Sequence, residues 1–328
     1  MNSKLEINDE VISQERLPRE KGRPPGRGSI FWDVITDINN GALMPSIAVM
    51  QSATPAVGTA VNKYALYKYD TLGRGIRTNW SLMRFLYGGG DVAYNESEAL
   101  RKLHANIKGT HADGSKYFAL DPLSFRIVPD TFLDGIIRIR KDIGKPLTKA
   151  EEEQVYEEYV QLCLLFGIPR KYIEPTLKDF FIYYDNLMRT GMTYNETVQF
   201  LLGDFPFKPM RLPKSLKFLE SRFNRYMEHT ARPRIRIAYV GALHPTYREV
   251  MGILWSAEDQ QKYERLCAAI ARRSKYLPRF LRTNPTAYLL MLGYKGPKLV
   301  TMDQLKEAEE KLKVINQKKR TRALQQSS

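Results

Sequence analysis

The sequence has little cysteine and no long hydrophobic run. Cys163 and Cys267 are its two cysteines among 328 residues, and each lies in a hydrophobic stretch with helical spacing. We therefore expect two buried thiols rather than a disulfide. No stretch approaches the roughly 20 continuous apolar residues that a membrane-spanning helix needs. The first residues, MNSKLEINDE, lack the apolar segment of a secretory signal, and together these absences predict a cytoplasmic protein.

Acidic residues are scarce relative to basic ones. The chain has 51 Lys and Arg against 36 Asp and Glu, which gives a formal net charge of +15. Much of the excess lies near the two ends, in residues 15–28 and 311–322. Such a charge suits nucleic acid, an anionic membrane surface or the acidic groups of a ligand.

The other cations are scattered through predicted helices, which is typical of a solvated surface. We therefore do not expect a nucleic-acid partner, although a basic helical nucleic-acid-binding protein or a non-catalytic interaction protein remains the alternative to an enzyme. Peripheral association with an anionic membrane through the basic ends is a further hypothesis. The sequence carries no signal for an oligomeric state.

Familiar catalytic and metal-binding motifs are missing as well. GxxxxGK[ST], GxSxG, HExxH and CxxC do not occur. The four histidines, at positions 104, 111, 229 and 244, show no short metal-ligand spacing. We expect His111 to be solvated in its loop and His244 to lie at a helix start before Pro245. The sequence thus gives no multi-residue signature of an enzyme or a metal site.

Helical patterns dominate from Ser29 onward. Thr148 and Glu151 have the spacing of a capping box, which starts a helix. The alternating run RIRIAYVG (234–241) is the one convincing strand pattern. The predicted helices are 31–39, 45–51, 56–67, 78–87, 95–108, 122–139, 148–166, 170–190, 195–202, 214–231, 244–252, 256–273, 277–282 and 301–318.

We predict an all-α, mainly helical fold with one domain over residues 29–295. A basic flexible arm (1–28) precedes this domain, and a C-terminal helix with a basic tail (296–328) follows it. The arm is rich in Pro, Gly and charge, a composition typical of flexible segments.

One predicted helix carries a histidine on an apolar face. In LRKLHANIKG (100–109), Leu100, Leu103, His104 and Ile107 recur at the i, i+3, i+4, i+7 spacing of a single helix face. Periodicity alone favours a core histidine that is hydrogen-bonded to a carbonyl group. The alternative is a neutral imidazole presented to a planar hydrophobic cofactor, since a haem iron needs one nitrogen ligand, aliphatic walls and cations near the propionates.

A second constellation lies about thirty residues upstream. Arg74, Arg77 and Thr78 form an RxxRT pattern ahead of an aromatic-rich predicted helix, in LGRGIRTNWSLMRFLYGG (72–89). These residues are either surface arginines with a threonine cap or the polar corner of a pocket. In a pocket, two guanidinium groups and a hydroxyl would donate hydrogen bonds to oxygen atoms of a ligand.

Read in order, these segments resemble a known family. The chain is similar to the catalytic domain shared by fungal mpaB-type oxygenases and bacterial rubber oxygenases (latex-clearing proteins), over roughly residues 30–290. The resemblance rests on several segments in the same order: 48–78, 99–128, 146–169, 212–223, 242–259 and 276–285.

The resemblance implies a globin-like helical core that binds haem b. It implies that His104 is the axial iron ligand and that Arg101 takes part in cofactor binding. Arg74, Arg77 and Thr78 match the RxxKT segment on the distal side of rubber oxygenases, where they would orient dioxygen.

This chain departs from the family pattern in two places. Arg77 replaces a lysine, and arginine stays protonated and is not expected to ligate iron. Pro129 of IVPDT replaces the histidine of a WVHxT-like sequence. The activity that the resemblance implies is oxidative cleavage of a C=C bond in a hydrophobic, isoprenoid-like small molecule with O2, by a haem-dependent oxygenase of the dioxygenase type.

Overall fold

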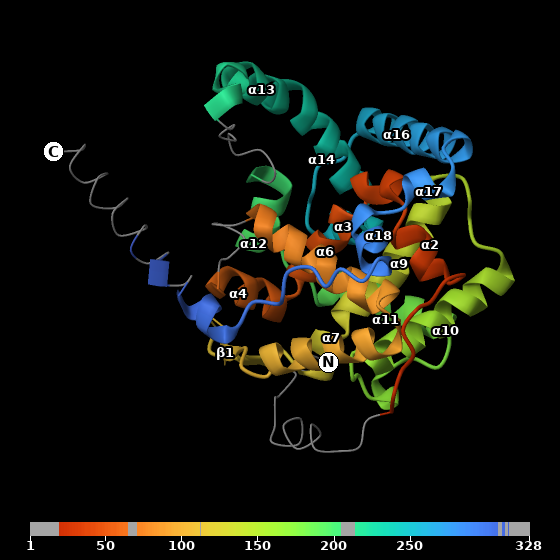
Figure 1. Cartoon of the computed structure of the whole chain (residues 1–328), viewed down its shortest axis with the longest axis vertical. Helices are drawn as coiled ribbons and strands as arrows, with labels where there is room; N and C mark the ends of the chain where they lie inside the picture. Colours follow the sequence, from red (N-terminus) through yellow and green to blue (C-terminus); the bar gives the residue numbers. More distant parts are fainter. Residues whose placement is uncertain are drawn as a thin grey trace.

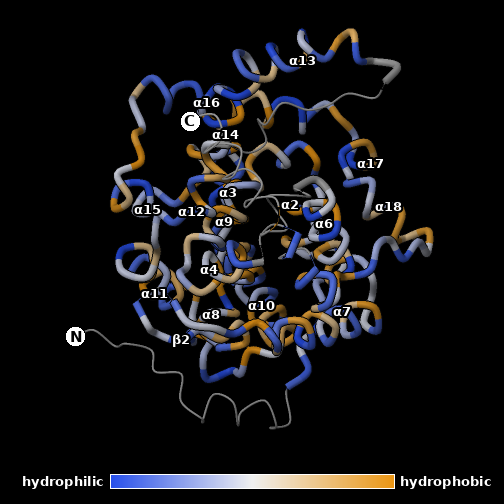
Figure 2. Tube along the Cα trace, turned by 90° about the vertical axis from the view of Figure 1, so that its left-hand side faces the viewer, coloured by the Kyte–Doolittle hydropathy of each residue, from blue (hydrophilic) through white to orange (hydrophobic). Residues whose placement is uncertain are grey.

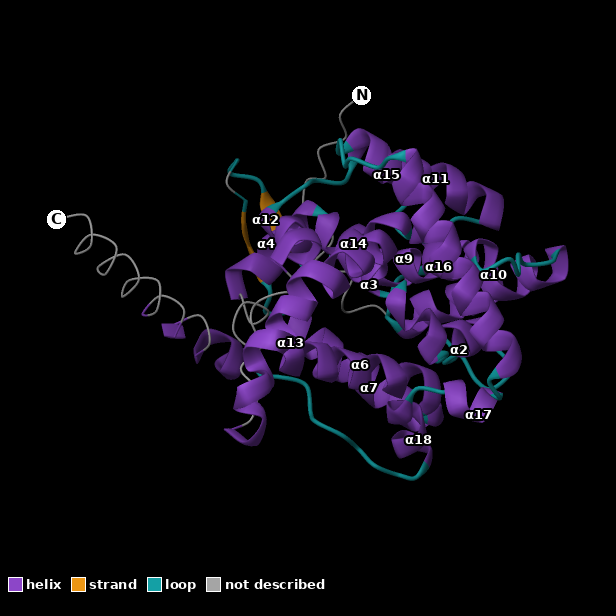
Figure 3. Ribbon diagram, turned by 90° about the horizontal axis from the view of Figure 1, so that it is seen from above, coloured by secondary structure: helices purple, strands orange, loops and turns teal. Residues whose placement is uncertain are grey.

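The structure, a computed structural model, describes residues 20–64, 71–111, 113–204, 214–307, 310, 311 and 314, and it is mainly helical (Figures 1 and 3). This confirms the all-α prediction. The elements follow one another in this order: α2 (Ile30–Ile35), η2 (Ile38–Ala42), α3 (Pro45–Ala53), α4 (Pro55–Tyr64), α6 (Thr71–Tyr87), α7 (Gly89–His104), β1 (Lys108–Thr110), β2 (Lys116–Phe118), α8 (Pro122–Phe125), α9 (Ile127–Asp142), α10 (Lys149–Leu165), η3 (Arg170–Tyr172), α11 (Leu177–Thr190), α12 (Glu196–Gln199), η4 (Phe200–Asp204), η5 (Lys214–Leu219), α13 (Glu220–Tyr226), η6 (Met227–Ala231), α14 (Arg232–Gly241), α15 (Pro245–Val250), α16 (Ala257–Tyr276), α17 (Arg279–Arg282) and α18 (Pro285–Met291).

Helix α9 lies at the centre of the fold. It packs against α2, α3 and α10, and Figure 1 shows it among these helices. Its buried side chains include Leu133, Ile136 and Ile139, which recur at helical spacing. The spacing explains why the segment is a helix, because it places an apolar stripe toward three neighbours at once.

A buried ion pair fixes the start of α9. The Nε atom of Arg126 lies 3.0 Å from Oδ2 of Asp130, and both side chains are almost fully buried. Arg126 also contacts Glu174, with 2.5 Å between Nη2 and Oε2, and the hydroxyl of Tyr159 donates to Oδ1 of Asp130 at 2.6 Å. Burial is the largest cause that raises the pKa of Asp130, to about 6. The network joins α9 to α10 and to the loop before α11.

The predicted strand over residues 234–241 is wrong, because this segment is helix α14. Its buried residues are Ile237, Ala238, Val240 and Gly241. Their spacing suits one helix face, whereas a half-buried strand would bury every second residue. The strands that occur in the described residues are β1 and β2, a short antiparallel hairpin that the sequence pattern did not indicate.

Several helix boundaries differ from prediction near the candidate site. Helix α6 begins at Thr71, seven residues before the predicted start, so Arg74 and Arg77 lie inside it. Helix α7 runs from Gly89 to His104 rather than over 95–108. The predicted capping box is present at Thr148 with Glu151, and a second one lies at Ser256 with Asp259.

The ends of the chain are described in part. Within the predicted arm, the carbonyl of Gly22 accepts a hydrogen bond from Tyr94 at 2.8 Å, and the amide of Arg23 donates to Gln161. Residues 1–19 and most residues beyond 311 lie outside the described residues, so the flexible arm and the basic tail stay predictions.

The two cysteines are buried and free, as predicted. Within the described part of the chain, no helix is long and apolar enough to cross a membrane. A cytoplasmic location stays a prediction.

The buried ion pair gives a first prediction. Arg126→Met would leave the carboxylate of Asp130 buried without its cation, which costs about 3–5 kcal/mol of unfolding free energy. Urea denaturation measures this loss. The matched control is Arg189→Met, because the Arg189–Asp185 pair has the same i,i+4 spacing and is exposed. We expect the control to change stability by less than about 1 kcal/mol, and equal losses in both variants would contradict the prediction.

Candidate functional site

Helices α6 and α7 form an antiparallel hairpin that brings the two candidate segments together. The turn lies at Gly88 and Gly89. Gly89 has a φ of +75°, which residues with a side chain rarely adopt. Arg74 precedes this turn by fourteen residues, and His104 follows it by fifteen. Because both helices rise equally per residue, the two residues lie at the same end of the hairpin.

The imidazole of His104 is held by its own helix. Its Nδ1 lies 2.7 Å from the carbonyl oxygen of Leu100. A carbonyl accepts but does not donate, so the Nδ1 atom carries the proton and the other ring nitrogen keeps its lone pair. Burial, followed by the charges of Arg101 and Arg74, lowers the pKa of His104, while the Leu100 carbonyl opposes this shift. The ring is therefore neutral at pH 7.

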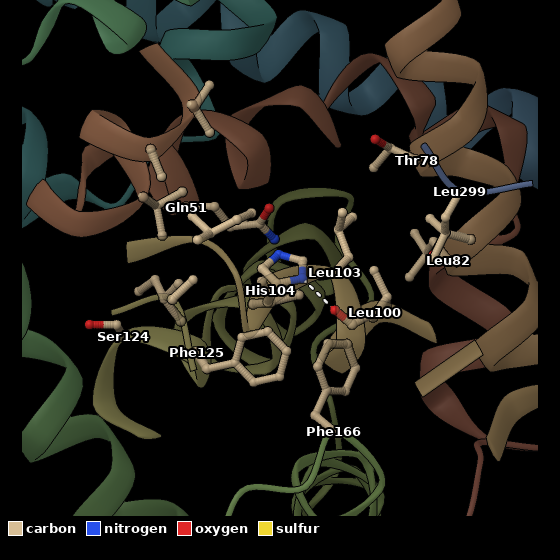
Figure 4. Close-up of a pocket in the computed structure, with 18 of the residues that line it drawn as sticks. Gln51, Thr78, Leu82, Leu100, Leu103, His104, Ser124, Phe125, Phe166 and Leu299 are labelled. Atoms are coloured by element: carbon tan, nitrogen blue, oxygen red, sulfur yellow. Dashed lines mark hydrogen bonds between the residues drawn. The ribbon is translucent and has the colours of Figure 1, made fainter. Parts of the chain in front are cut away.

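His104 lines an apolar cavity of about 340 Å³. The other three residues of the predicted face, Leu100, Leu103 and Ile107, line it too. Phe125 meets the imidazole edge-on at 5.3 Å between ring centroids. Figure 4 shows this ring and Phe166 on the side of His104 that also holds the Leu100 carbonyl. Further apolar lining residues are Ala56, Val57, Ala60, Val61, Leu82, Phe85, Ala119, Ile127, Val128, Phe132, Leu299, Val300 and Leu305.

The predicted polar corner also belongs to this cavity. Arg74, Arg77 and Thr78 all line it, from the first two turns of α6. The two arginines are partly buried, and Thr78 is exposed at the rim. Arg101 is not among the described residues that line the cavity, and its guanidinium donates to the carbonyl of Phe166 at 3.2 Å. Its role in cofactor binding stays a prediction.

Gln51 is a polar lining residue that the sequence did not reveal. It comes from α3, and Figure 4 shows its amide on the side of the imidazole away from Leu100. The amide nitrogen donates to the Thr131 hydroxyl at 3.1 Å. A single glutamine on an apolar helix belongs to no motif, so only the packing of α3 against α9 could have identified it.

The segment after α18 closes one side of the cavity. Leu299, Val300 and Leu305 come from this segment and line the cavity. A buried arginine of α6, Arg84, anchors the segment, because its guanidinium donates to the carbonyl of Pro297 at 2.6 Å and to that of Lys295. We call residues 294–305 the closing segment.

Gly296 allows the closing segment to pack closely against Trp80 of α6. Gly296 has a φ of +63°, and a Cβ atom at this position would lie 2.3 Å from ring atoms of Trp80. Both the backbone conformation and the close approach exclude a side chain here.

No cluster of three or more His, Cys, Asp or Glu suited to a metal ion occurs among the described residues. His111 is not simply solvated as expected, because its Nδ1 contacts the Thr59 hydroxyl at 3.0 Å and its ring packs on Tyr117. His244 lies at the start of α15, as expected, and burial lowers its pKa to about 4. These two histidines do not line the cavity described above.

The cavity that holds His104 lies within a stretch that matches a known family. Residues 32–272 match the model of the ER-bound oxygenase mpaB/B'/rubber oxygenase catalytic domain. The chain belongs to this oxygenase family. Searches of the curated proteins and of the solved structures found no match.

The residues that match this oxygenase family include His104 and the polar corner but not the closing segment. The match ends at residue 272, whereas Leu299, Val300 and Leu305 lie beyond it. One wall of the cavity therefore comes from a part of the chain outside the family match. Pro129, which replaces the expected histidine, is buried in α9.

The contact between Gly296 and Trp80 gives a second prediction. Gly296→Ala would add a methyl group against the indole and strain the backbone, so we expect the closing segment to loosen by about 1–3 kcal/mol. Hydrogen exchange of the amides of residues 295–300, followed by mass spectrometry, measures this change.

Gly293→Ala is the matched control for this variant. Gly293 also has a positive φ, of +84°, but no atom lies within 4 Å of the position that a Cβ atom would take there. The two variants share the backbone strain and differ in the clash with Trp80. If exchange of residues 295–300 rises equally in both, the indole contact does not hold the segment.

Proposed function

We propose that this chain is a haem b-dependent oxygenase that uses O2 to cleave a C=C bond of a hydrophobic, isoprenoid-like small molecule. The observation that carries the proposal is the state of His104. Its Nδ1 proton is bound to the Leu100 carbonyl, and its other nitrogen keeps a lone pair beside an apolar cavity. This is the state in which histidine ligates a metal.

The residues around the cavity fit a flat, largely apolar prosthetic group. His104 would supply the iron ligand, and the Leu100 carbonyl would orient the ring, as hydrogen-bonded partners of ligating histidines do. Aliphatic and aromatic side chains provide the walls. Arg74 and Arg77 are cations at the cavity edge that suit carboxylate groups of the ligand or dioxygen itself.

Bound haem would supply the activation of dioxygen, which amino-acid side chains do not provide. The protein then has three tasks. His104 would hold the group in one orientation, Arg77 and Thr78 would offer hydrogen-bond donors at the cavity wall, and the apolar walls would exclude water. An apolar substrate suits these walls because burial of its hydrocarbon surface favours binding.

Haem binding is the first test of this proposal. We expect the purified wild-type protein to bind about one haem b per chain, with a Soret absorption and a pyridine haemochrome of the b type. His104→Ala should lose this absorption on titration with haemin, because the iron loses its ligand. His111→Ala is the control, since His111 is the nearest other histidine in sequence and does not line the cavity.

Circular dichroism must show that both variants keep their helical content. A folded His104→Ala variant that loads fully with haem would refute the ligand assignment. A wild-type protein that stays folded and takes up no haemin would instead favour a non-catalytic interaction protein.

The reaction is the second test. With an isoprenoid oligomer and ¹⁸O2, we expect two carbonyl fragments that each carry one labelled oxygen atom, detected by mass spectrometry. Arg77→Met should slow product formation by roughly a hundredfold because one charged donor is lost. Its haem content should stay at the wild-type level. Label in one fragment alone would contradict the dioxygenase type, and an unchanged rate would remove Arg77 from the reaction.

A further inference from the structure

A stretch near the C-terminal end of the described residues carries charge of one sign. Residues 265–302 contain eight Lys and Arg and no Asp or Glu, although about four acidic residues would be expected there from the composition of the chain. Five of these cations are exposed between residues 272 and 298: Arg272, Arg273, Lys275, Lys295 and Lys298. This stretch lies outside both basic ends that the sequence analysis singled out.

Large apolar side chains are exposed in the same stretch. Tyr276 is 74% exposed, Phe280 is 64% exposed and Leu292 is 75% exposed. Single exposed hydrophobic residues are common on protein surfaces, but a concentration of them marks a binding surface. The complete set between residues 276 and 294 is Tyr276, Phe280, Leu281, Leu289, Met291, Leu292 and Tyr294.

The fold places α17, α18 and the loop after α18 along one edge of the molecule. Helices α17 and α18 lie next to one another in Figures 1, 2 and 3, and Figure 3 shows the loop after α18 on the same edge. The Tyr288 hydroxyl donates to the carbonyl of Phe280 at 2.6 Å, which ties α18 to α17. Arg279 pairs with Asp33 at 3.1 Å and so holds α17 against α2. These contacts support α17 and α18, and we call the exposed side chains of residues 272–298 the 272–298 surface.

We propose that the 272–298 surface docks the protein peripherally on an anionic lipid bilayer. Exposed aliphatic side chains such as Leu281 and Leu292 gain from burial in hydrocarbon, and tyrosine suits the lipid–water interface. The neighbouring cations are attracted by anionic headgroups, at about 1 kcal/mol for each Lys or Arg near the surface. Nucleic acid would satisfy the cations and stack on the tyrosines, but it offers no partner for the leucines.

The position of this surface relative to the cavity supports a lipid partner. Lys298 is exposed at the end of the surface, and the next two residues, Leu299 and Val300, line the cavity. Because the surface includes the first residues of the closing segment, 294–298, a bilayer on this surface would contact that segment. Apolar molecules partition into bilayers, so this position would shorten their path to the cavity; the docking itself does not depend on the proposed oxygenase activity.

Vesicle flotation with the full-length chain tests the proposal. We expect binding to vesicles of phosphatidylcholine with phosphatidylserine and little binding to phosphatidylcholine alone. The double variant Leu292→Ser with Tyr294→Ser should bind the anionic vesicles roughly tenfold more weakly or worse, because it loses two apolar contacts with the bilayer. Leu254→Ser is the matched control, since Leu254 is 83% exposed outside this surface, and it should bind as the wild type does.

A fluorescent label tests insertion directly. Cys163 and Cys267 are buried, so Leu292→Cys and Leu254→Cys each provide one exposed thiol for an environment-sensitive dye. Fluorescence should rise on anionic vesicles for the label at 292 and stay constant at 254.

Four results would overturn the proposal. One is the absence of vesicle binding by the wild type. Another is binding that the double variant does not weaken but that deletion of residues 1–19 and 315–328 abolishes, since the basic ends would then be responsible. RNA binding that the double variant weakens, without vesicle binding, would assign the surface to nucleic acid. A dimer in solution that the double variant dissociates, again without vesicle binding, would assign it to a second copy of the chain.

Discussion

The ion pair between Arg84 and Glu96 is the interaction on which the shape of the cavity depends. It joins α6 to α7 inside their hairpin, at 3.3 Å between Nη1 and Oε2, and both side chains are nearly buried. A guanidinium group has five donors, so the same cation can also bind carbonyls of the closing segment. One buried charge thus connects the helix of the polar corner, the helix of His104 and the wall that comes from the end of the chain.

Local periodicity predicted which residues around His104 face the same way. The four residues expected on one face of the helix at 100–107 all line the cavity, although α7 ends at His104 and Ile107 follows it. The pattern succeeded because it depends on neighbours within two turns. Each of the two expectations for His104 agrees with one observation. The ring is hydrogen-bonded to a carbonyl, as in a core histidine, and it lines an apolar cavity, as a cofactor ligand would.

Contacts between distant segments were beyond local patterns. The first two turns of α6 were missed because Gly73 and Gly75 weaken the helical signal there. The hairpin that places Arg74 and His104 at the same end was therefore missed too. Leu299 and Val300 line the cavity, and Arg84, more than two hundred residues earlier, binds the backbone just before them. Such a contact follows from the packed fold and leaves no periodic signal in either segment.

The arginines near the imidazole affect its protonation state. Burial disfavours the imidazolium ion, and the charges of Arg101 and Arg74 add to this effect, so the pKa of His104 falls. A protonated ring could not ligate iron, whereas the neutral ring keeps a lone pair on one nitrogen. Because arginine does not lose its proton, these cations keep their effect at any physiological pH. Arg77 lines the same cavity and is also a permanent cation, so it can donate hydrogen bonds there without acting as a metal ligand, in keeping with the proposed role of His104.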